Sequence, residues 1–434
     1  MGNNLVRKTY TTDSTWTAPA GVTSVKVVAM SSLETFSGAM HGTPFIDINN
    51  DMYSFGINAN GSVGDATVAI KSSPVLVVGG LKFRYVSAGQ FHTIAITDAG
   101  DAYAWGRNTN GEIGDASIVA KSSPVLVVGG LKFKQVNAGW SQSHGITTDG
   151  QLYSWGANRL GDGSTTSKSS PVAVTGGLTF VQSSAGNGAG IGLTSSGDAY
   201  AWGINSNGLV GDNSTTTRAS PVAVVGGLKF KQISLFNSTA YGITTAGDLY
   251  AWGGNAVGQI GDGTTTPKSS PVLVVGGLKW RYVSSGGGST TNGTETAVAI
   301  ASNGDAYAWG SNDAGQIGDG TVVAKSSPVL VVGGLKWARV SAGYTSLGVT
   351  TSGKLYAWGN NPGDGTTVAK SSPVLVAVGL KLFNGKMLES NAAVFDVTPG
   401  NSYSITVNGN FCTFNGEVVA RGIGQVTIYL EYLA

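Results

Sequence analysis

The stretch DAYAWGRNTNGEIGDASIVAKSSPVLVVGGLKF, residues 101–133, decides the fold of this chain because it occurs more than once. A close copy, DAYAWGSNDAGQIGDGTVVAKSSPVLVVGGLKW, fills residues 305–337, and looser copies occupy most of the remaining sequence. A unit that recurs at a regular period is the sequence signature of a repeat architecture, in which each copy builds one structural element.

Two short motifs show how many copies the sequence contains. An aromatic residue followed by glycine occurs seven times, with spacings of 50, 50, 47, 50, 57 and 49 residues, at Phe55, Trp105, Trp155, Trp202, Trp252, Trp309 and Trp358. The Ser-Pro-Val motif also occurs seven times, with its proline at Pro74, Pro124, Pro171, Pro221, Pro271, Pro328 and Pro373. A period of this length with glycine doublets and aromatic markers favours β-propeller blades over helical repeats.

Each copy contains four short segments rich in β-branched and aromatic residues, and none shows helical periodicity. In the second copy these segments are residues 82–89, 92–97, 101–106 and 123–129. We therefore predict an all-β fold, a seven-bladed β-propeller of four-stranded antiparallel blades. The loops from the first to the second strand and from the third to the fourth share one face, here called the loop face. The remaining tight turns share the opposite face, the turn face.

The motifs WGxNxxGxIGD, SSPV and VSAGxxH resemble the regulator of chromosome condensation repeat, whose members form seven-bladed β-propellers. The resemblance covers residues 33–381. The first copy departs most from the pattern, because Phe55 replaces tryptophan and Pro44 falls within its second strand.

The two chain ends carry a second resemblance. YTTDSTWTAPAGVTSVKVVAM (10–30) and VTPGNSYSITVNGNFCTFNGEVVARGIGQVTIYLEYL (397–433) are similar to the start and the end of a glycine-rich domain of bacteriophage tail and tail-fibre proteins. The middle of that domain is missing, and the repeats stand in its place. We therefore predict that residues 1–32 and 382–434 form one small β-sandwich-like base domain, into which the propeller, residues 33–381, is inserted.

Every copy has an aspartate after a glycine and a lysine or arginine six residues later. A ring of ligand-binding charges is one interpretation, but each cation is accompanied by an anion, which favours structural ion pairs or aspartate-capped loops. The predicted structural pairs are Asp65–Lys71, Asp115–Lys121, Asp162–Lys168, Asp212–Arg218, Asp262–Lys268, Asp319–Lys325 and Asp364–Lys370.

The copies diverge most in the loop between the first and second strands. Neutral drift at loop tips is one explanation, but aromatic and amide side chains exposed on a rigid scaffold suit ligand contact. The receptor-binding candidates are Met40, His41, Gln90, Phe91, His92, Trp140, Gln142, Asn187, Phe236, Asn237, Thr290, Thr291, Asn292 and Tyr344.

Composition narrows the function classes. Among the 434 residues, 41% are hydrophobic and 12% charged, with a net charge of +2, which argues against a nucleic-acid-binding protein. The single cysteine, Cys412, excludes an intrachain disulfide and is expected in a turn of the base domain. The first residues contain no apolar segment, so we expect neither a secretion signal nor a membrane-spanning helix.

Catalytic chemistry is not predicted. The three histidines occupy different positions within their copies: His41, His92 and His144. The isolated carboxylates Glu34, Asp47 and Glu295 lack the paired spacing of glycoside hydrolases. We therefore expect a protein that is not an enzyme and that binds neither a metal nor a cofactor.

The resemblances lead to two hypotheses. The first is a non-enzymatic bacteriophage virion protein, such as a tail fibre, assembled in the host bacterial cytoplasm. Its base domain would attach to other tail proteins or to further copies, as a trimer if it follows tail fibres. Its propeller would bind a glycan or protein receptor on the host surface. The alternative is a cellular propeller regulator or interaction scaffold, similar to the nucleotide-exchange factor of the repeat family.

Overall fold

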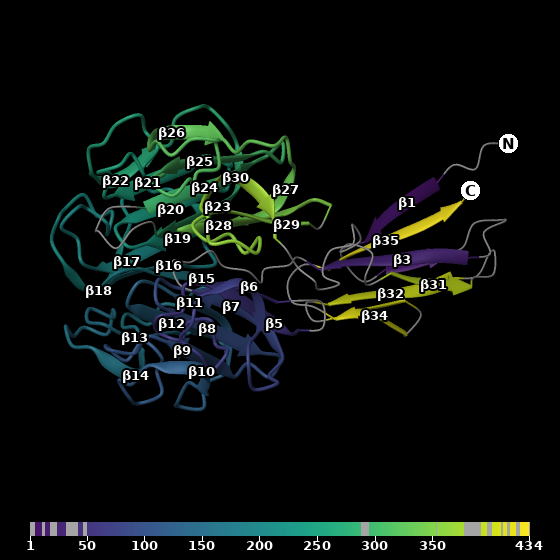
Figure 1. The fold of residues 1–434 in the computed structure, drawn as a ribbon, viewed down its shortest axis with the longest axis horizontal. Coiled ribbons are helices and arrows are strands. Elements are labelled where there is room, and N and C mark those ends of the chain that lie inside the picture. Colours follow the sequence, from purple (N-terminus) through teal and green to yellow (C-terminus); the bar gives the residue numbers. More distant parts are fainter. Residues whose placement is uncertain are drawn as a thin grey trace. The chain divides into compact units, whose positions relative to one another are not determined.

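The chain folds into β-strands throughout the part that the computed structural model describes (Figure 1). This part comprises residues 42–46, 50–287, 295–352 and 354–376 with their side chains, and the backbone of eight strands nearer the chain ends. No helix capable of crossing a membrane occurs within these residues. The chain divides into two compact units: one holds Met1–Glu34, Ser352–Lys354 and Leu380–Ala434, and the other holds Thr35–Thr351 and Leu355–Gly379.

The larger unit is the predicted seven-bladed propeller, and strands within each blade pair in sequence order. Blade 1 contributes β4 (Thr43–Ile46), β5 (Met52–Gly56) and β6 (Lys71–Leu76) to the described residues. Blade 2 consists of β7 (Phe83–Ala88), β8 (His92–Thr97), β9 (Ala102–Gly106) and β10 (Lys121–Leu126). Blade 3 consists of β11 (Phe133–Ala138), β12 (Gln142–Thr147), β13 (Leu152–Gly156) and β14 (Lys168–Ala173).

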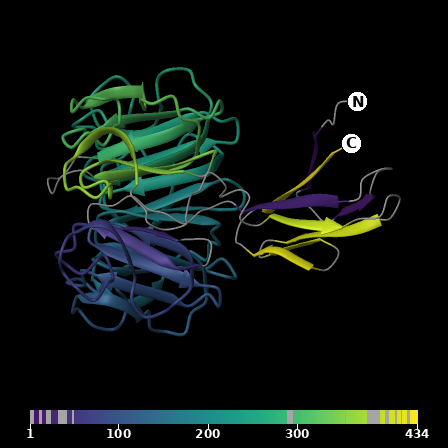
Figure 2. The same cartoon turned by 45° about the vertical axis from the view of Figure 1, so that its right-hand side comes forward.

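The remaining four blades repeat this plan (Figure 2). Blade 4 consists of β15 (Gln182–Ala185), β16 (Ala189–Leu193), β17 (Ala199–Gly203) and β18 (Arg218–Ala223). Blade 5 consists of β19 (Phe230–Phe236), β20 (Thr239–Thr244), β21 (Leu249–Gly253) and β22 (Lys268–Leu273). Blade 6 consists of β23 (Trp280–Gly287), β24 (Glu295–Ala301), β25 (Ala306–Gly310) and β26 (Lys325–Leu330). Blade 7 consists of β27 (Trp337–Ser341), β28 (Thr345–Thr350), β29 (Leu355–Gly359) and β30 (Lys370–Leu375).

The position of each strand within its blade follows from its sequence. The third strands, such as AYAWG in β9, are almost fully buried because their side chains pack against both neighbouring blades. The fourth strands carry the Ser-Pro-Val motif and are half-exposed. Proline has no backbone N–H to donate, so it is confined to sheet edges, and these strands form the outer edge of each blade.

Tryptophan and glycine join neighbouring blades. The Trp105 indole Nε1–H donates to the Ser62 carbonyl of the preceding blade at 3.0 Å. Gly64 lies under the same indole with φ of +80°, and a Cβ on it would lie 2.6 Å from Trp105 Nε1. Glycine is therefore required there both for the left-handed backbone and for the close approach of the ring.

A repeated backbone hydrogen bond holds the ring together. In each blade the residue after the loop aspartate donates its N–H to a carbonyl in the fourth strand of the next blade. The seven bonds are Ala66 to Ser122, Ala116 to Ser169, Gly163 to Ala219, Asn213 to Ser269, Gly263 to Ser326, Gly320 to Ser371 and Gly365 to Ser72. The last one connects blade 7 to blade 1, so the ring is closed.

The turn face carries a second set of ion pairs. The lysine of a Gly-Gly-Leu-Lys turn contacts the aspartate that begins the third strand of the preceding blade, as in Lys132–Asp101 at 2.5 Å. The same pair recurs as Lys82–Asp51, Lys229–Asp198, Lys279–Asp248 and Lys336–Asp305. Between blades 3 and 4 both partners are replaced, by Gln151 and Thr179. The residues of the turn face therefore recur from blade to blade partly because they form these ion pairs.

The smaller unit pairs strands from both ends of the chain. One sheet has the order β1 (Leu5–Tyr10), β35 (Val426–Leu433), β3 (Ser24–Ser31) and β31 (Ala392–Asp396). The other has the order β2 (Ser14–Thr17), β32 (Ser402–Asn408), β33 (Phe411–Phe414) and β34 (Glu417–Arg421). The smaller unit thus contains strands from both chain ends. Cys412 lies in β33 and not in a turn, because residues 411–414 pair with β32.

The predicted boundaries of the propeller, between residues 32 and 33 and between 381 and 382, lie outside the described residues.

Candidate functional site

A buried asparagine shapes five of the seven loops between a third and a fourth strand. Asn108 Oδ1 accepts the Ile113 N–H at 2.9 Å, while Nδ2 donates to Asp115 Oδ1 and to the Ser117 carbonyl, both at 3.1 Å. The same contacts recur at Asn58, Asn205, Asn255 and Asn312. These five loops from a third to a fourth strand are therefore held by their own hydrogen bonds, so their remaining side chains are directed by a fixed backbone.

The repeated aspartates serve the same loops. An ion pair joins Asp65–Lys71 (2.8 Å), Asp115–Lys121 (3.3 Å), Asp212–Arg218 (2.6 Å), Asp262–Lys268 (3.2 Å), Asp319–Lys325 (3.3 Å) and Asp364–Lys370 (3.5 Å). Asp162 accepts the Ser164 N–H at 2.9 Å, and within the described residues no ion pair joins it to Lys168. These carboxylates are engaged within the propeller.

Hydrogen bonding keeps these aspartates ionised. Burial by itself raises the pKa of Asp65, but hydrogen bonds from Lys71 and Thr67 outweigh that effect, and the pKa lies below its ordinary value. The same balance lowers the pKa of Asp115, where Ser117 and Lys121 are the donors. A bound ligand would have to displace these intramolecular donors, which favours a structural role for the charges.

Seven exposed aliphatic side chains stand on these loops at the rim of the loop face. They are 58 to 65% exposed and belong to blades 1, 2, 6 and 7: Val68, Ile70, Ile118, Val119, Val322, Val323 and Val368. We call this set the apolar arc. In blades 3, 4 and 5 the same loop positions carry only serine, threonine and proline, in GSTTS, NSTTT and GTTTP.

Ring closure places the loops of the apolar arc on four successive blades. Blades 6 and 7, 7 and 1, and 1 and 2 are successive neighbours, joined by the bonds from Gly320 to Ser371, Gly365 to Ser72 and Ala66 to Ser122. The loop face is therefore divided into an apolar sector of four blades and a polar sector of three. Exposed apolar side chains gathered on a folded protein are typical of surfaces that contact another macromolecule.

Several predicted receptor-binding candidates are not exposed. Gln90, His92, Gln142, Phe236 and Asn237 are buried. The Gln142 amide, for example, donates to the Ala157 and Asn158 carbonyls at 3.0 and 2.6 Å. Phe236 belongs to strand β19, which is longer than the corresponding strand of blade 4, and it packs against Gly287. The expectation that these side chains are exposed was wrong. His92, Gln142 and Phe236 belong to strands β8, β12 and β19, where contacts within and between blades cover them.

Two of the aromatic candidates lie together and are half-exposed. The rings of Phe91 and Trp140, from blades 2 and 3, meet edge to face with centroids 5.9 Å apart. The Arg107 guanidinium lies 4.2 Å above the Phe91 ring and donates to the Trp140 carbonyl at 2.9 Å. Its Nε also pairs with the buried Glu112 carboxylate at 3.1 Å. This cluster lies where blade 2 meets blade 3, and it forms a rigid aromatic surface there.

The other candidates are distributed around the ring. Asn187 is half-buried and lines a cavity together with Asn237, and Tyr344 is half-buried on blade 7. The remaining candidates lie outside the described residues: Met40, His41, Thr290, Thr291 and Asn292.

Two of the three histidines are structural. His92 Nε2 lies 2.8 Å from the Ser143 hydroxyl, and His144 stacks on the buried Trp202 ring. Burial lowers the pKa of each to about 3, with the nearby Arg107 charge contributing at His92, so both imidazoles are neutral near pH 7. In the described residues no three His, Cys, Asp or Glu side chains are grouped as metal ligands would be.

Sequence reasoning missed the apolar arc and the ion pairs of the turn face. A signal for both was present in the aligned copies. Three to five residues after the loop aspartate, four copies carry valine or isoleucine and three carry only serine, threonine or proline. Gln151 and Thr179 replace an acid and a base together. The missing information was which of these side chains are exposed and which of them are in contact.

Comparison with known proteins agrees with this architecture. Residues 49–96, 99–145, 246–291 and 303–348 match the family model of the regulator of chromosome condensation (RCC1) repeat, and residues 83–112 match a second model of the same description. The chain therefore carries RCC1 repeats.

Solved propellers are similar in fold. Human WBSCR16 has a TM-score of 0.66 at 18% identity, over 76% of this chain and 95% of that one. Yeast RCC1 (Prp20), solved bound to Kap60, has a TM-score of 0.65 at 16% identity, over 96% and 90% of the two chains. Prp20p from Saccharomyces cerevisiae, studied with its binding to Gsp1p and histones, has a TM-score of 0.63 at 17% identity over 96% and 93%. At these identities the likeness concerns the fold alone.

Proposed function

We propose that this chain is a non-enzymatic interaction protein whose propeller binds a protein partner through the apolar arc. The observation that carries the proposal is the exposure of seven valine and isoleucine side chains on four successive blades. A protein surface with matching apolar side chains would remove this area from water, at about 25 cal/mol for each Å² buried. The partner's contact would therefore be apolar at its centre.

Two features support a binding role over a catalytic one. The charged side chains of the loop face are engaged in ion pairs and loop hydrogen bonds, as in Asp65–Lys71 and Arg107–Glu112. The two described histidines are fully buried. Propellers of the same fold are described with protein partners, Kap60 in one case and Gsp1p and histones in another.

The test replaces apolar loop residues of blades 2 and 6 with the polar residues found in the loop of blade 4. Replacing Ile118, Val119, Val322 and Val323 with threonine copies Thr215 and Thr216 of blade 4, and Asn108 and Asn205 bond the loop backbone identically in both contexts. The full chain and this variant are immobilised and exposed to a lysate of the cells that make the protein. Retained proteins are identified, and the strongest is then purified and titrated.

The partner should bind the natural chain and lose about tenfold or more in affinity with the variant, since four buried aliphatic groups are removed. The matched control, Thr215→Val with Thr216→Val, adds apolar groups outside the apolar arc and should leave the affinity unchanged. Equal affinity for the natural chain and the threonine variant would contradict the proposal.

A bacteriophage tail protein is the second candidate. It is favoured by the pairing of strands from the two chain ends, β1 with β35, β3 with β31 and β2 with β32, around an inserted propeller. Such a protein would reside in the virion tail as a homo-oligomer and present the loop face to a host receptor. Genes for virion structural proteins beside this one would support this candidate, and a cellular operon would oppose it.

A further inference from the structure

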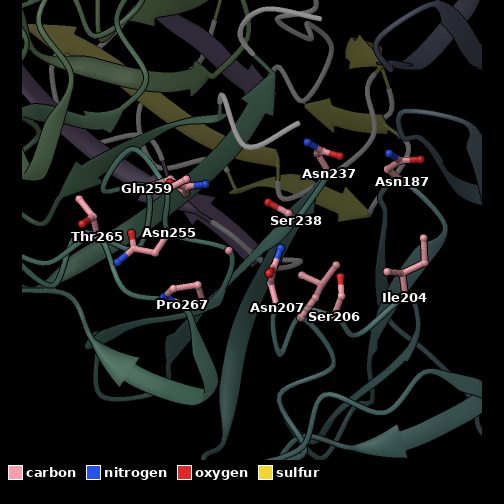
Figure 3. A pocket seen from close by; sticks show the side chains of 13 residues that line it. Asn187, Ile204, Ser206, Asn207, Asn237, Ser238, Asn255, Gln259, Thr265 and Pro267 are labelled. Atoms are coloured by element: carbon pink, nitrogen blue, oxygen red, sulfur yellow. The ribbon is translucent and has the colours of Figure 1, made fainter. Parts of the chain in front are cut away.

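A cavity of about 470 Å³ opens on the loop face between blades 4 and 5 (Figure 3). Its lining residues all lie between strands, in the two loops of each of these blades. The volume falls within the range of about 300 to 1,000 Å³ that small-molecule sites occupy. This cavity is in the polar sector of the loop face, away from the apolar arc, so what it binds is independent of the proposed function.

The lining combines polar and apolar groups and carries no charged side chain. Five amide and three hydroxyl side chains contribute to it, and none of its thirteen residues is acidic or basic. Ile204 and Pro267 add apolar surface at separate points of the wall. An anionic ligand would lose hydration there without meeting a cation, and the Glu295 carboxylate behind the wall is buried and held by the Ser238 N–H and hydroxyl, so an ionised ligand is disfavoured. The ligand class is therefore neutral, with several hydrogen-bonding groups.

Some of the polar groups are available to a ligand. Ser206 and Asn207 from blade 4 and Thr265 from blade 5 are exposed, and their side chains make no hydrogen bond within the described residues. They face the same cavity from its two sides (Figure 3). By contrast, the Asn255 amide is used inside its loop, where it holds the wall in place. The site therefore combines a fixed wall with free donors and acceptors on opposing blades.

We propose that this cavity binds an uncharged carbohydrate. Sugar hydroxyls both donate and accept, as amide and hydroxyl side chains do, so one sugar ring can bond to Asn207 and Thr265 together. The C–H faces of the ring would pack on Ile204 and Pro267. A peptide is less suited, because extended peptides are bound by the backbone of a strand edge, and no strand residue lines this cavity.

The test titrates the full chain with glucose, galactose, N-acetylglucosamine and their disaccharides, with binding followed by calorimetry and by saturation-transfer NMR. Glucuronate and N-acetylneuraminate serve as charged probes, and a neutral Asn/Thr-rich peptide serves as the peptide probe. The variant Asn207→Ala with Thr265→Ala removes two free polar groups and should fold normally. Its control is Thr215→Ala, an exposed threonine three residues after Asp212, as Thr265 is after Asp262, but outside the cavity.

At least one neutral sugar should bind, with an affinity about tenfold lower in the double variant because two hydrogen bonds are lost. The Thr215→Ala control should bind it as the natural chain does. The proposal is overturned if no neutral sugar binds at millimolar concentration, or if only the charged sugars or the peptide bind. It is also overturned if the double variant binds the sugar unchanged, since the sugar would then occupy another site.

Discussion

The backbone N–H of Gly365 donates to the carbonyl oxygen of Ser72 at 3.2 Å and thereby connects the last blade to the first. Beside it, the Asn361 amide donates to the Lys71 carbonyl at 3.3 Å. These contacts join residues at opposite ends of the propeller sequence. The stretch of chain between the joined residues therefore includes all the other blades. Contacts of such separation cost chain entropy, which the packing of blade 7 against blade 1 must offset.

A substitution at Gly363 tests how tightly blade 7 packs against blade 1. Its φ is +77°, and an added Cβ would lie 2.6 Å from the buried Phe55 ring. We expect Gly363→Ala to lower the free energy of unfolding by about 1–3 kcal/mol more than Gly365→Ala, because overpacking is added to backbone strain. Urea denaturation measures the difference.

Gly365→Ala is the matched control because its site is open, with φ of +87° and no atom within 4 Å. Ala66 and Ala116 occupy the same position in their blades with φ of 64°. Equal losses in the two variants would mean that Phe55 moves aside and that the closing contact is loosely packed.

The indole hydrogen bonds between blades are tested by comparing two tryptophans. Trp252 Nε1–H donates to the Leu209 carbonyl at 2.9 Å, whereas the buried Trp202 Nε1–H has no partner in the described residues. The loop of blade 3 that faces Trp202 is three residues shorter than that of blade 2. We expect Trp252→Phe to cost about 1–2 kcal/mol more in unfolding free energy than Trp202→Phe.

Both substitutions remove similar packing area, so chemical denaturation of the two variants isolates the hydrogen bond. Similar losses would indicate that a bound water satisfies the Trp202 indole.

Because His144 is buried, we expect the folded protein to lose stability in acid. Burial lowers its pKa from 6.5 to about 3, so as pH falls the unfolded chain binds a proton before the folded chain does. The stability from the neutral imidazole is complete above about pH 6.5 and decreases towards pH 3, by up to about 1.4 kcal/mol per pH unit. Isoleucine stands at the corresponding place in blade 2, Ile94, so His144→Ile should remove this part of the decrease.

The measurement is the unfolding free energy of both proteins between about pH 4 and 8. The difference between them should be constant above pH 7 and should grow in favour of the variant below pH 6. His92 titrates in both proteins and cancels. A difference that does not change with pH would show that the imidazole is protonated without cost.

The two kinds of ion pair should differ in strength. Asp115 accepts the Ser117 N–H at 3.0 Å and an Asn108 amide hydrogen, in addition to pairing with Lys121. Asp101 contacts Lys132 through its carboxylate on the exposed turn face. We expect Asp115→Ala to cost about 1–3 kcal/mol, because buried donors lose their acceptor, and Asp101→Ala to cost less than about 1 kcal/mol.

Salt provides the control for this comparison. The small effect of Asp101→Ala should decrease further at high ionic strength, while that of Asp115→Ala should persist because it rests on hydrogen bonds. The reverse order of costs would mean that the turn face, and not the loop face, stabilises the blades.

Much of the propeller was predictable because its information is local and repeated. The blade count follows from seven aromatic-glycine pairs, and the outer position of the fourth strand follows from proline. The exposure of the loop candidates was not predictable in the same way. Gln142 and Phe236 are buried by contacts with residues that are distant in the sequence or belong to another blade, such as Asn158 and Gly287. The differences among the copies in this loop indicated where packing varies. They did not indicate which side chains face solvent.

The sequence by itself determined a closed β-propeller of seven similar blades, because each copy repeats the strands, turns and glycines that one blade needs. Only the tertiary structure decided which loop side chains are exposed to solvent. The bond from Gly365 to Ser72 places blade 7 beside blade 1, so the apolar loops of blades 6, 7, 1 and 2 form one arc. The remaining polar loops enclose the uncharged cavity of blades 4 and 5. The exposure of a loop side chain depends on contacts with remote residues and other blades, and no local pattern encodes it.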